Sequence, residues 1–327
     1  MAMATQIVQK TMKAITIDQF GGIDELKPVT LSVPAILDDE ILIRVESAGV
    51  GVWDPFEREG GFADMLGIKP KFPYVIGTEG AGTIAAIGRS VDQTKFKEGD
   101  RVYAASLANP KGGFYAEFAA VKAENVSHIP GELTTLQAGA LAIDAITALQ
   151  GLDLLDLKRG QSVLIFGASG GIGHLAVQFA RRMGLRVLAA ASGDDGVELV
   201  QRLGADWVLD GHKGDVAEAA GKLVPGGLDG ALLTAGGEAA ERALEIVRQG
   251  GRVAYPNGVE PVPQPRSGLT FQSYDGLIDR QTIDRINRLV EAGSFDVCIA
   301  HAFPLEQAAD AHRALEAHFL GKIVLVP

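Results

Sequence analysis

Cysteine is almost absent from this chain: Cys298 is the only one among 327 residues. A disulfide within the chain is therefore impossible, and a structural zinc site built from several cysteines is excluded. A single cysteine fits a reducing compartment, so we expect a cytoplasmic protein in which Cys298 is a small buried apolar residue.

Basic charge and long apolar runs are also scarce. The chain has 30 Lys and Arg residues and 41 Asp and Glu residues, which gives a net charge of −11. A negative charge of this size does not favour binding to nucleic acid or to an anionic membrane. No apolar run approaches the roughly 18–20 residues of a membrane helix, and residues 1–11 lack the apolar part of a signal peptide. We expect a soluble protein that binds a small molecule, not nucleic acid or a membrane.

The first part of the chain has the pattern of a β domain. Between residues 12 and about 130, short β-rich runs such as 14–17, 40–45 and 82–87 are separated by glycine and proline turns. This spacing is typical of a barrel or sandwich.

The second part alternates between two kinds of element. A helical pattern at 133–157 is followed by strands predicted at 162–166, 186–191, 207–209, 230–233, 252–255 and 269–271, and by helices predicted at 174–183, 196–203, 216–223 and 238–248. Such alternation predicts βαβ units and a parallel sheet. Two more helices, at 279–292 and 304–319, precede a strand at 321–326, which is placed so that it can return to the first domain.

A glycine-rich loop lies between the first apolar strand and the first amphipathic helix of this part. Ala168, Gly170 and Gly173 match a dinucleotide-binding pattern in which alanine replaces the first glycine. In such a loop the pyrophosphate rests on free N–H groups at the helix N-terminus. We therefore predict cofactor contacts from Gly167, Ala168, Ser169, Gly170, Gly171, Ile172 and Gly173.

The residue after the second strand of this part bears on the choice between NAD and NADP. It is Ser192, not the acid that usually holds the ribose hydroxyls of NAD. However, Asp194 and Asp195 follow, and the loop has no Lys or Arg. The missing acid favours NADPH, and NADH remains an alternative.

Several short segments recur in an order and spacing that match a known family. They are Ala48-Gly49-Val50, Asp54 with Arg58-Glu59-Gly60, Gly77-Thr78-Glu79-Gly80-Ala81-Gly82, Gly99-Asp100-Arg101-Val102, Tyr115-Ala116-Glu117-Phe118, Thr147-Ala148-Leu149, the glycine loop and Gly321-Lys322-Ile323-Val324-Leu325. The chain resembles the zinc-free quinone oxidoreductase branch of the medium-chain dehydrogenase/reductase superfamily from Met12 to Pro327.

The resemblance implies an α/β fold with two domains. A GroES-like β-barrel catalytic domain is expected at 12–132 and 275–327, and a Rossmann-type, doubly wound, parallel-sheet cofactor domain at 133–274. The active site is expected in the cleft between them.

The resemblance also implies that no metal is bound. The zinc ligands of relatives correspond to Gly51, Thr78 and roughly Ile143, and none of these can ligate zinc. The histidines show no metal-binding spacing, and we expect His312 and His318 to lie at the surface of a helix. Without a Lewis acid, reducing a quinone or an activated C=C bond is easier than oxidising an alcohol.

Asp54, Arg58 and Thr147 are the catalytic candidates. Asp54 and Arg58 belong to a segment that lines the substrate cleft in the family, although they can equally be a pair that fixes the loop. Thr147 matches a threonine near the nicotinamide, or else it simply bonds its own helix backbone. Trp53, Phe56 and Phe62 are expected to pack on a flat substrate, with a role in the core as the alternative.

Further cofactor contacts are implied at the ends of later strands. They are Ser192, Ala235, Gly236, Asn257 and Gly258. Where many NADPH-binding relatives carry a Tyr–Arg pair, this chain has Gly211-His212, which weakens the NADPH assignment. Lys322 is expected to be a structural strand lysine, with the cofactor phosphates as its alternative contact.

Together these features predict a zinc-independent, NADPH-dependent oxidoreductase that reduces quinones or enones. Two alternatives remain: an enzyme like the zinc-type alcohol dehydrogenases, and a dinucleotide-binding sensor or structural protein without useful turnover. Relatives often pair through the edge of the cofactor sheet, so residues 268–273 predict a homodimer.

Overall fold

The structure, a computed structural model, describes residues 9–213 and 216–327. These residues separate into two compact units. The first contains the described residues up to Ile143 together with Ile278–Asn287 and Ile299–Pro327. The second contains the described residues of Asp144–Leu277 and the segment Arg288–Cys298. The chain therefore passes from the first unit into the second and returns.

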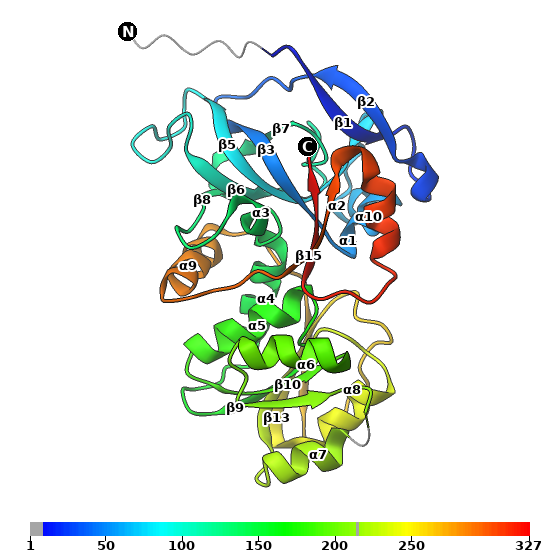
Figure 1. Cartoon of the computed structure of the whole chain (residues 1–327), viewed down its shortest axis with the longest axis vertical. Coiled ribbons are helices and arrows are strands. Elements are labelled where there is room, and N and C mark those ends of the chain that lie inside the picture. Colours follow the sequence, from blue (N-terminus) through cyan, green and yellow to red (C-terminus); the bar gives the residue numbers. More distant parts are fainter. Residues whose placement is uncertain (1–8, 214–215) are drawn as a thin grey trace. The chain divides into compact units, whose positions relative to one another are not determined.

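A small antiparallel sheet opens the first unit (Figure 1). Its strands, in the order β2-β1-β4, are β2 (Lys27–Ser32), β1 (Thr11–Ile17) and β4 (Tyr74–Val75). Met12 and Ala14 are buried while Lys13 between them is exposed, as expected for a strand with one face in the core. The main-chain N–H of Ile15 donates to Tyr115 O at 2.8 Å, which joins this sheet to the segment that carries Tyr115.

A seven-stranded sheet forms most of the first unit. Its path is β15 (Ile299–Pro304), β16 (Lys322–Val326), β3 (Glu40–Val50), β5 (Glu79–Ile87), β6 (Arg101–Ala105) and β8 (Val126–His128), and β7 (Phe118–Lys122) also pairs with β3. The final strand pairs antiparallel with β3, with Ile323 opposite Val50 and Leu325 opposite Ala48. The return of the C-terminal strand to the first domain is thus confirmed.

The helical segments of the first unit are short. They are α1 (Trp53–Arg58), α2 (Gly61–Leu66), α3 (Thr135–Ala138) and α10 (Ala308–Ala314), with 3-10 turns η1 (Ile23–Glu25), η2 (Ala123–Asn125) and η4 (Leu305–Gln307). The sequence did not predict α1 and α2, because glycines 60 and 61 were interpreted as a turn. Instead Gly60 and Gly67, with φ of +95° and +66°, bound α2 at its two ends.

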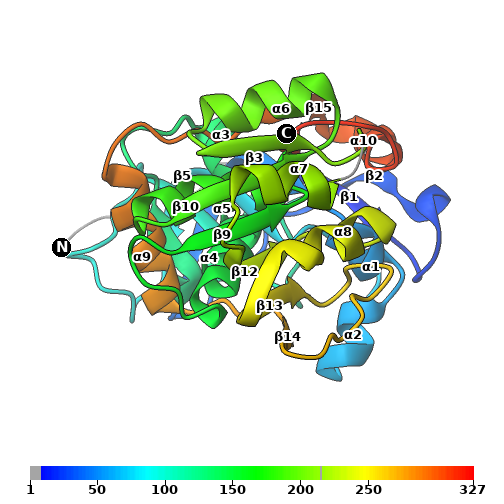
Figure 2. The ribbon, with the colours of Figure 1, turned by 90° about the horizontal axis from the view of Figure 1, so that it is seen from below.

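A six-stranded parallel sheet forms the centre of the second unit. Its order is β11 (Trp207–Asp210), β10 (Arg186–Ala191), β9 (Ser162–Phe166), β12 (Leu228–Leu233), β13 (Val247–Pro256) and β14 (Thr270–Tyr274). Strands β9, β10, β12 and β13 lie side by side in Figure 2. All five residues of β9 are buried, which is why this strand is apolar throughout.

Helices pack against this sheet. They are α4 (Ala142–Leu154), α5 (Gly171–Arg182), α6 (Gly193–Arg202), α7 (Val216–Leu223) and α8 (Glu238–Ala243) with the 3-10 turn η3 (Leu244–Ile246). Helix α9 (Arg280–Glu291) is divided between the two units after Asn287. Helix α5 contacts β9 and β10, while α7 and α8 share a core with Leu164 and Phe166 of β9. In the described part of the chain, no helix has both the length and the apolar composition needed to cross a membrane.

Two of the predicted helices have wrong bounds. The helix expected at 238–248 ends at Ala243, and Val247 already begins β13. The helix expected at 304–319 is reduced to α10, and β15 before it was not predicted. At Val247 the helical spacing of apolar residues continues directly into a strand, so periodicity alone does not locate the boundary.

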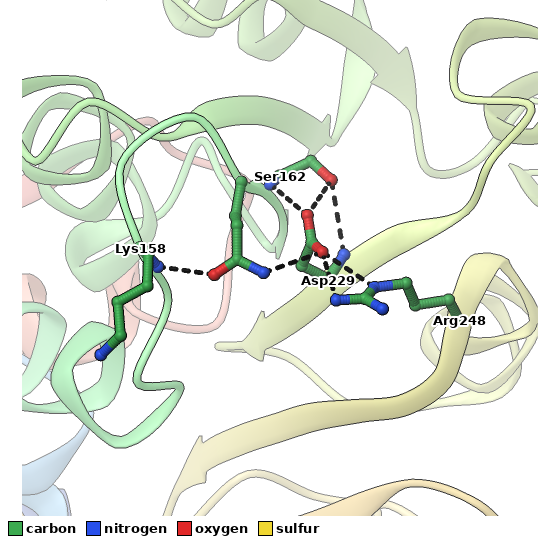
Figure 3. Close-up of polar contacts among 5 residues, drawn as sticks. Lys158, Ser162, Asp229 and Arg248 are labelled. Carbon is green, nitrogen blue, oxygen red and sulfur yellow. Dashed lines mark hydrogen bonds and ion pairs between the residues drawn. The ribbon is translucent and has the colours of Figure 1, made fainter.

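One partly buried carboxylate connects the amino ends of three strands of the second unit (Figure 3). Asp229 of β12 accepts hydrogen bonds from the Ser162 N–H at 2.7 Å, the Ser162 hydroxyl at 2.9 Å and the Arg248 Nε at 2.8 Å. The side-chain amide of Gln161 also donates to it, at 3.0 Å. Burial opposes ionisation, but these donors keep the pKa of Asp229 below its usual value.

Candidate active site

The glycine loop has the geometry of an anion-binding loop. Gly170 is the extended N-cap of α5, and the amides of the first helical turn have no acceptor within the helix. A Cβ at Gly173 would lie 2.2 Å from Gly167 O, so glycine is required for the helix to approach the loop. A Cβ at Gly170 would have its nearest neighbour, Gly167 O, at 3.5 Å, so a methyl group fits at this position without a clash. The loop therefore fits the pyrophosphate of a dinucleotide.

The other predicted cofactor residues lie at the carboxyl ends of neighbouring strands. The Ser192 N–H, after β10, donates to Ser169 Oγ at 3.3 Å, which joins that strand end to the glycine loop. Ala235 follows β12 and lies close to the glycine loop, because a Cβ placed on Gly167 would be 3.3 Å from the Ala235 Cβ. Gly236 is closely packed, because a Cβ there would lie 2.4 Å from Pro261 O.

The residues after β13 are placed differently. The Asn257 N–H donates to Tyr274 O at 2.8 Å, and Gly258 has a φ of +94° with open space around its Cα. In parallel sheets, ligands bind at this edge. The fold thus brings the predicted cofactor residues of the second unit to one edge of one sheet.

His212 and Lys213 lie beside Ser192, and the sequence did not predict this arrangement. The Ser192 hydroxyl is 3.0 Å from His212 Nε2, and Lys213 forms ion pairs with Asp194 and, at 3.4 Å, with Asp210. Hydrogen bonds to these two aspartates raise the pKa of Lys213, which keeps it cationic. The loop after β10 has no Lys or Arg of its own, but the loop after β11 supplies His212 and Lys213 to it.

Helix α1 of the first unit carries three buried ionisable side chains. Asp54 Oδ2 accepts the Gly51 N–H at 2.7 Å, and Glu57 accepts the Tyr74 hydroxyl and the Gly77 N–H at 2.8 Å each. Burial raises the pKa of Asp54 well above its usual value, and the charge of Glu57 adds to this. Burial likewise raises the pKa of Glu57 to about 7, although its two hydrogen bonds act in the opposite direction.

The third ionisable residue of α1, Arg58, lies beside a buried histidine. Arg58 Nη1 is 3.1 Å from His312 Nδ1, and His312 Nε2 is 3.1 Å from the Tyr115 hydroxyl. Burial and the charge of Arg58 lower the pKa of His312 to about 3, so this histidine stays neutral. The expectation that His312 lies at the surface is wrong, since it is 3% exposed, whereas His318 is exposed as expected. Helix α10 ends at Ala314, so the two residues do not share a helix.

The three positions that the family resemblance matches to zinc ligands, Gly51, Thr78 and roughly Ile143, lie near a second buried ion pair. Lys322 Nζ is 3.1 Å from Glu79 Oε1 and 4.5 Å from the centre of the Trp53 ring. Glu79 Oε2 also accepts the Ile143 N–H at 2.8 Å. Lys322 is therefore a strand lysine in a buried pair, which agrees with its expected structural role.

These residues do not fit a zinc ion. Gly51 and Ile143 have no ligating side chain, and a Cβ at Gly51 would lie 2.4 Å from Trp53 Cζ2, so the indole fills the space beside that position. Among the described residues, no three His, Cys, Asp or Glu side chains are arranged to hold a metal ion.

The remaining predicted residues have the following places. Phe56 is 46% exposed, Phe62 is buried, and their rings meet edge to face with centres 5.1 Å apart. Thr147 is a buried residue of α4 in the second unit, and its carbonyl accepts the Tyr274 hydroxyl at 2.8 Å. Two adjacent helices of the first unit, α1 and α2, thus supply five of the predicted residues: Trp53, Asp54, Phe56, Arg58 and Phe62.

Sequence reasoning missed Glu57, Tyr115 and His312 as members of the buried group in the first unit. A signal was present for Tyr115, which stands in one of the segments that resemble the family. Nothing in the local pattern distinguishes His312, because its two partners are 254 and 197 residues away along the chain.

Comparison with known proteins finds matches over both units. The family model described as "Alcohol dehydrogenase GroES-like domain" matches residues 37–131, and the one described as "Zinc-binding dehydrogenase" matches residues 171–283. A quinone oxidoreductase of Lama guanicoe is 32% identical over 334 residues, covering 97% of this chain and 98% of the relative.

Two further matches support the same relationship. A chloroplastic NADPH-dependent alkenal/one oxidoreductase of Arabidopsis thaliana is 30% identical over 330 residues and covers 98% of this chain and 81% of the relative. Among solved structures, a mycobacterial protein complexed with NADPH has a TM-score of 0.80 and 27% identity, covering 97% of this chain and 100% of the other.

Proposed function

The chain belongs to the quinone oxidoreductase branch of the medium-chain dehydrogenase/reductase superfamily, and from this premise we propose that it reduces quinones or enones with NADPH and without zinc. One observation carries the zinc independence: the Trp53 indole fills the space beside Gly51, at a position where relatives place a metal ligand. Reduction of a conjugated acceptor needs no Lewis acid, because the conjugation of the acceptor itself spreads the charge.

The residues of the chain then have mainly binding and orienting roles. When bound, the dinucleotide supplies the hydride, and the loop amides from Gly170 to Gly173 hold its pyrophosphate. Phe56 and Phe62, with Trp53, offer flat apolar surface to a flat acceptor.

Two buried donors of the first unit are proposed to bind the acceptor's carbonyl oxygen. Trp53 Nε1 and Thr78 Oγ1 have no hydrogen-bond partner within the described chain, and a buried polar group without a partner is costly. A carbonyl oxygen accepts hydrogen bonds, so it can serve as acceptor for these donors.

Asp54 and Arg58 are proposed to support this arrangement. Burial raises the pKa of Asp54 well above its usual value, which favours its neutral acid form over the carboxylate. Arg58 binds Gly21 O at 3.0 Å and Glu59 at 2.5 Å besides His312, so its proposed role is to hold α1 in place. Thr147 is proposed to stand near the nicotinamide, as its match to the family implies.

The preference for NADPH is proposed to come from the group around Ser192. A 2′-phosphate there would meet the Ser192 hydroxyl, His212 and the cationic Lys213. The relative named as NADPH-dependent and the structure complexed with NADPH support this choice.

Replacing Lys213 tests the cofactor preference. The Lys213→Ala variant should raise the KM for NADPH about tenfold and leave the KM for NADH unchanged, because only the 2′-phosphate loses a charged partner. Lys222→Ala is the matched control, since Lys222 is an exposed lysine of α7 that pairs with Glu218. Equal effects on both cofactors would contradict the assignment.

Activity and metal content test the function itself. The purified chain should oxidise NADPH when given ortho- or para-quinones or short enones, and a strong chelator should leave the rate unchanged. About one zinc per chain together with loss of activity on chelation would instead point to the zinc-type enzymes. Tight NADPH binding without turnover on any acceptor would support the sensor alternative.

The cellular setting and the assembly are also proposals. We propose a cytoplasmic enzyme that binds neither nucleic acid nor membrane. We further propose a homodimer, because β14 is the last strand in the order of the described parallel sheet and three of its five residues are exposed.

A further inference from the structure

His174 lies wholly buried one turn into α5, directly behind the glycine loop. Its Nδ1 is 2.8 Å from Gly170 O, the carbonyl of the helix N-cap. The same carbonyl also accepts the main-chain N–H of His174 at 3.0 Å. One residue thus holds this carbonyl with two donors.

The second ring nitrogen fixes which tautomer is present. The Cys298 N–H donates to His174 Nε2 at 3.2 Å, so Nε2 carries no proton. A neutral imidazole with a bare Nε2 has its proton on Nδ1, and Gly170 O can only accept. The Cys298 amide therefore selects the tautomer that donates to the glycine loop.

Cys298 is itself held in place by the same helix. Gln178 and Asp296 exchange two hydrogen bonds, from Gln178 Nε2 to Asp296 O at 2.8 Å and from the Asp296 N–H to Gln178 Oε1 at 2.9 Å. Arg182 donates to the carbonyls of Gly293 and Ser294 at 3.0 and 2.7 Å. The segment that presents the Cys298 amide is thus fixed along α5.

Holding the Gly170 carbonyl has a consequence for the next amide. The peptide group between Gly170 and Gly171 is planar, so its C=O and its N–H point in opposite directions. When the carbonyl is directed into the helix, the Gly171 N–H is directed out of the N-terminus, where a pyrophosphate would bind.

We infer that His174 is a positioning residue for the dinucleotide: it orients the Gly170–Gly171 peptide so that the Gly171 amide meets the pyrophosphate. This inference rests on the proposed function, because it concerns the same cofactor site. It also assigns the Cys298 main chain, not its thiol, a part in cofactor binding.

Three substitutions of His174 separate its two contacts. In His174→Asn the side-chain amide nitrogen takes the place of Nδ1, so the bond to Gly170 can persist while the bond from Cys298 is lost. In His174→Gln the distal amide group takes the place of Nε2, so the bond from Cys298 can persist while the bond to Gly170 is lost. His174→Leu removes both contacts. We expect the Kd for NADP+ to stay within about twofold of wild type in the Asn variant and to rise about tenfold in the Gln and Leu variants.

A ligand without a pyrophosphate distinguishes positioning from general damage. Isothermal titration with adenosine 2′-phosphate should give the same Kd in wild type and in all three variants, because that ligand does not reach the loop amides. If the wild type binds only NAD+, then NAD+ and adenosine replace the two ligands. Thermal unfolding of each variant, followed by circular dichroism, identifies any that fails to fold.

Two results would overturn the inference. The first is an Asn variant that binds NADP+ as weakly as the Leu variant, and the second is a Gln variant that binds as tightly as wild type. Failure of the wild type to bind either dinucleotide would instead refute the proposed function, so the two failures are distinguishable.

Discussion

At the scale of single residues, the buried group around α1 contains ionisable side chains whose pKa values shift in opposite directions. The pKa of Glu57 is raised from 4.5 to about 7, whereas the pKa of His312 is lowered from 6.5 to about 3. The folded protein therefore binds the proton of Glu57 more tightly than the unfolded chain does, and the proton of His312 more weakly.

These shifts predict opposite effects of pH on stability. Glu57 makes stability fall as the pH rises from 4.5 to about 7, by about 3 kcal/mol. His312 makes stability fall as the pH drops from 6.5 to about 3. Asp54, whose pKa is also raised, acts in the same direction as Glu57. Between pH 4.5 and 6.5 the two effects partly cancel.

Two variants reveal the two slopes. In urea unfolding, Glu57→Gln should lose less stability than wild type as the pH rises from 4.5 to 6.5, because one of the two acids with a raised pKa is gone while His312 remains. His312→Gln should lose stability over the same range, because the contributions of Glu57 and Asp54 remain. Parallel curves for the two variants would show that these side chains do not titrate as assigned.

At the scale of elements, the glycine loop separates two requirements for glycine. Gly173 has no room for a Cβ within the folded chain, whereas Gly170 has. One position is therefore restricted by the packing of α5 on the loop, and the other only by the approach of a ligand.

Matched alanine substitutions test this difference. Gly173→Ala should lower the free energy of unfolding by about 2 kcal/mol, because its methyl group meets backbone atoms that cannot move independently. Gly170→Ala should unfold at nearly the wild-type temperature but bind NADP+ roughly tenfold more weakly. If Gly170→Ala binds the dinucleotide normally, the pyrophosphate does not lie against this residue.

The Asp229 cluster is the other feature that acts at the scale of elements. Asp229→Ala should lower the free energy of unfolding by about 2–4 kcal/mol, because the buried amide of Ser162 would lose its acceptor. Arg248→Ala is the control, and it should cost less than about 1 kcal/mol because the arginine side chain is half-exposed. Chemical denaturation measures both values, and similar losses would contradict this account.

At the scale of the whole molecule, the free edge of the parallel sheet predicts self-association. Light scattering should give a mass twice the 34.3 kDa of one chain, because β14 offers unpaired backbone groups to a second copy. A lysine in place of Gln272 in β14 should shift the mass towards that of the single chain, since charged side chains oppose edge-to-edge pairing. A wild-type protein with the mass of one chain would refute the dimer.

Much of the fold follows from local pattern. The alternation of apolar strands and amphipathic helices from residue 162 onwards predicted the parallel sheet, and β10 and α7 have the predicted bounds. The glycine loop was recognised because its requirements are local: a tight turn, a free helix N-terminus and little side-chain volume within seven residues. Short helices such as α1 and α2 were missed, because six residues give too little periodicity.

The chain's sequence by itself therefore determined the type of each unit, the glycine loop and the lack of ligating side chains at Gly51 and Ile143, because each depends on neighbouring residues or on residue identity alone. Only the tertiary structure decided that His312 is buried against Arg58, that Lys213 reaches the loop of Ser192 and that Cys298 sets the tautomer of His174. Each of these contacts joins residues far apart in the chain, and the free energy that fixes them comes from packing that no local pattern encodes.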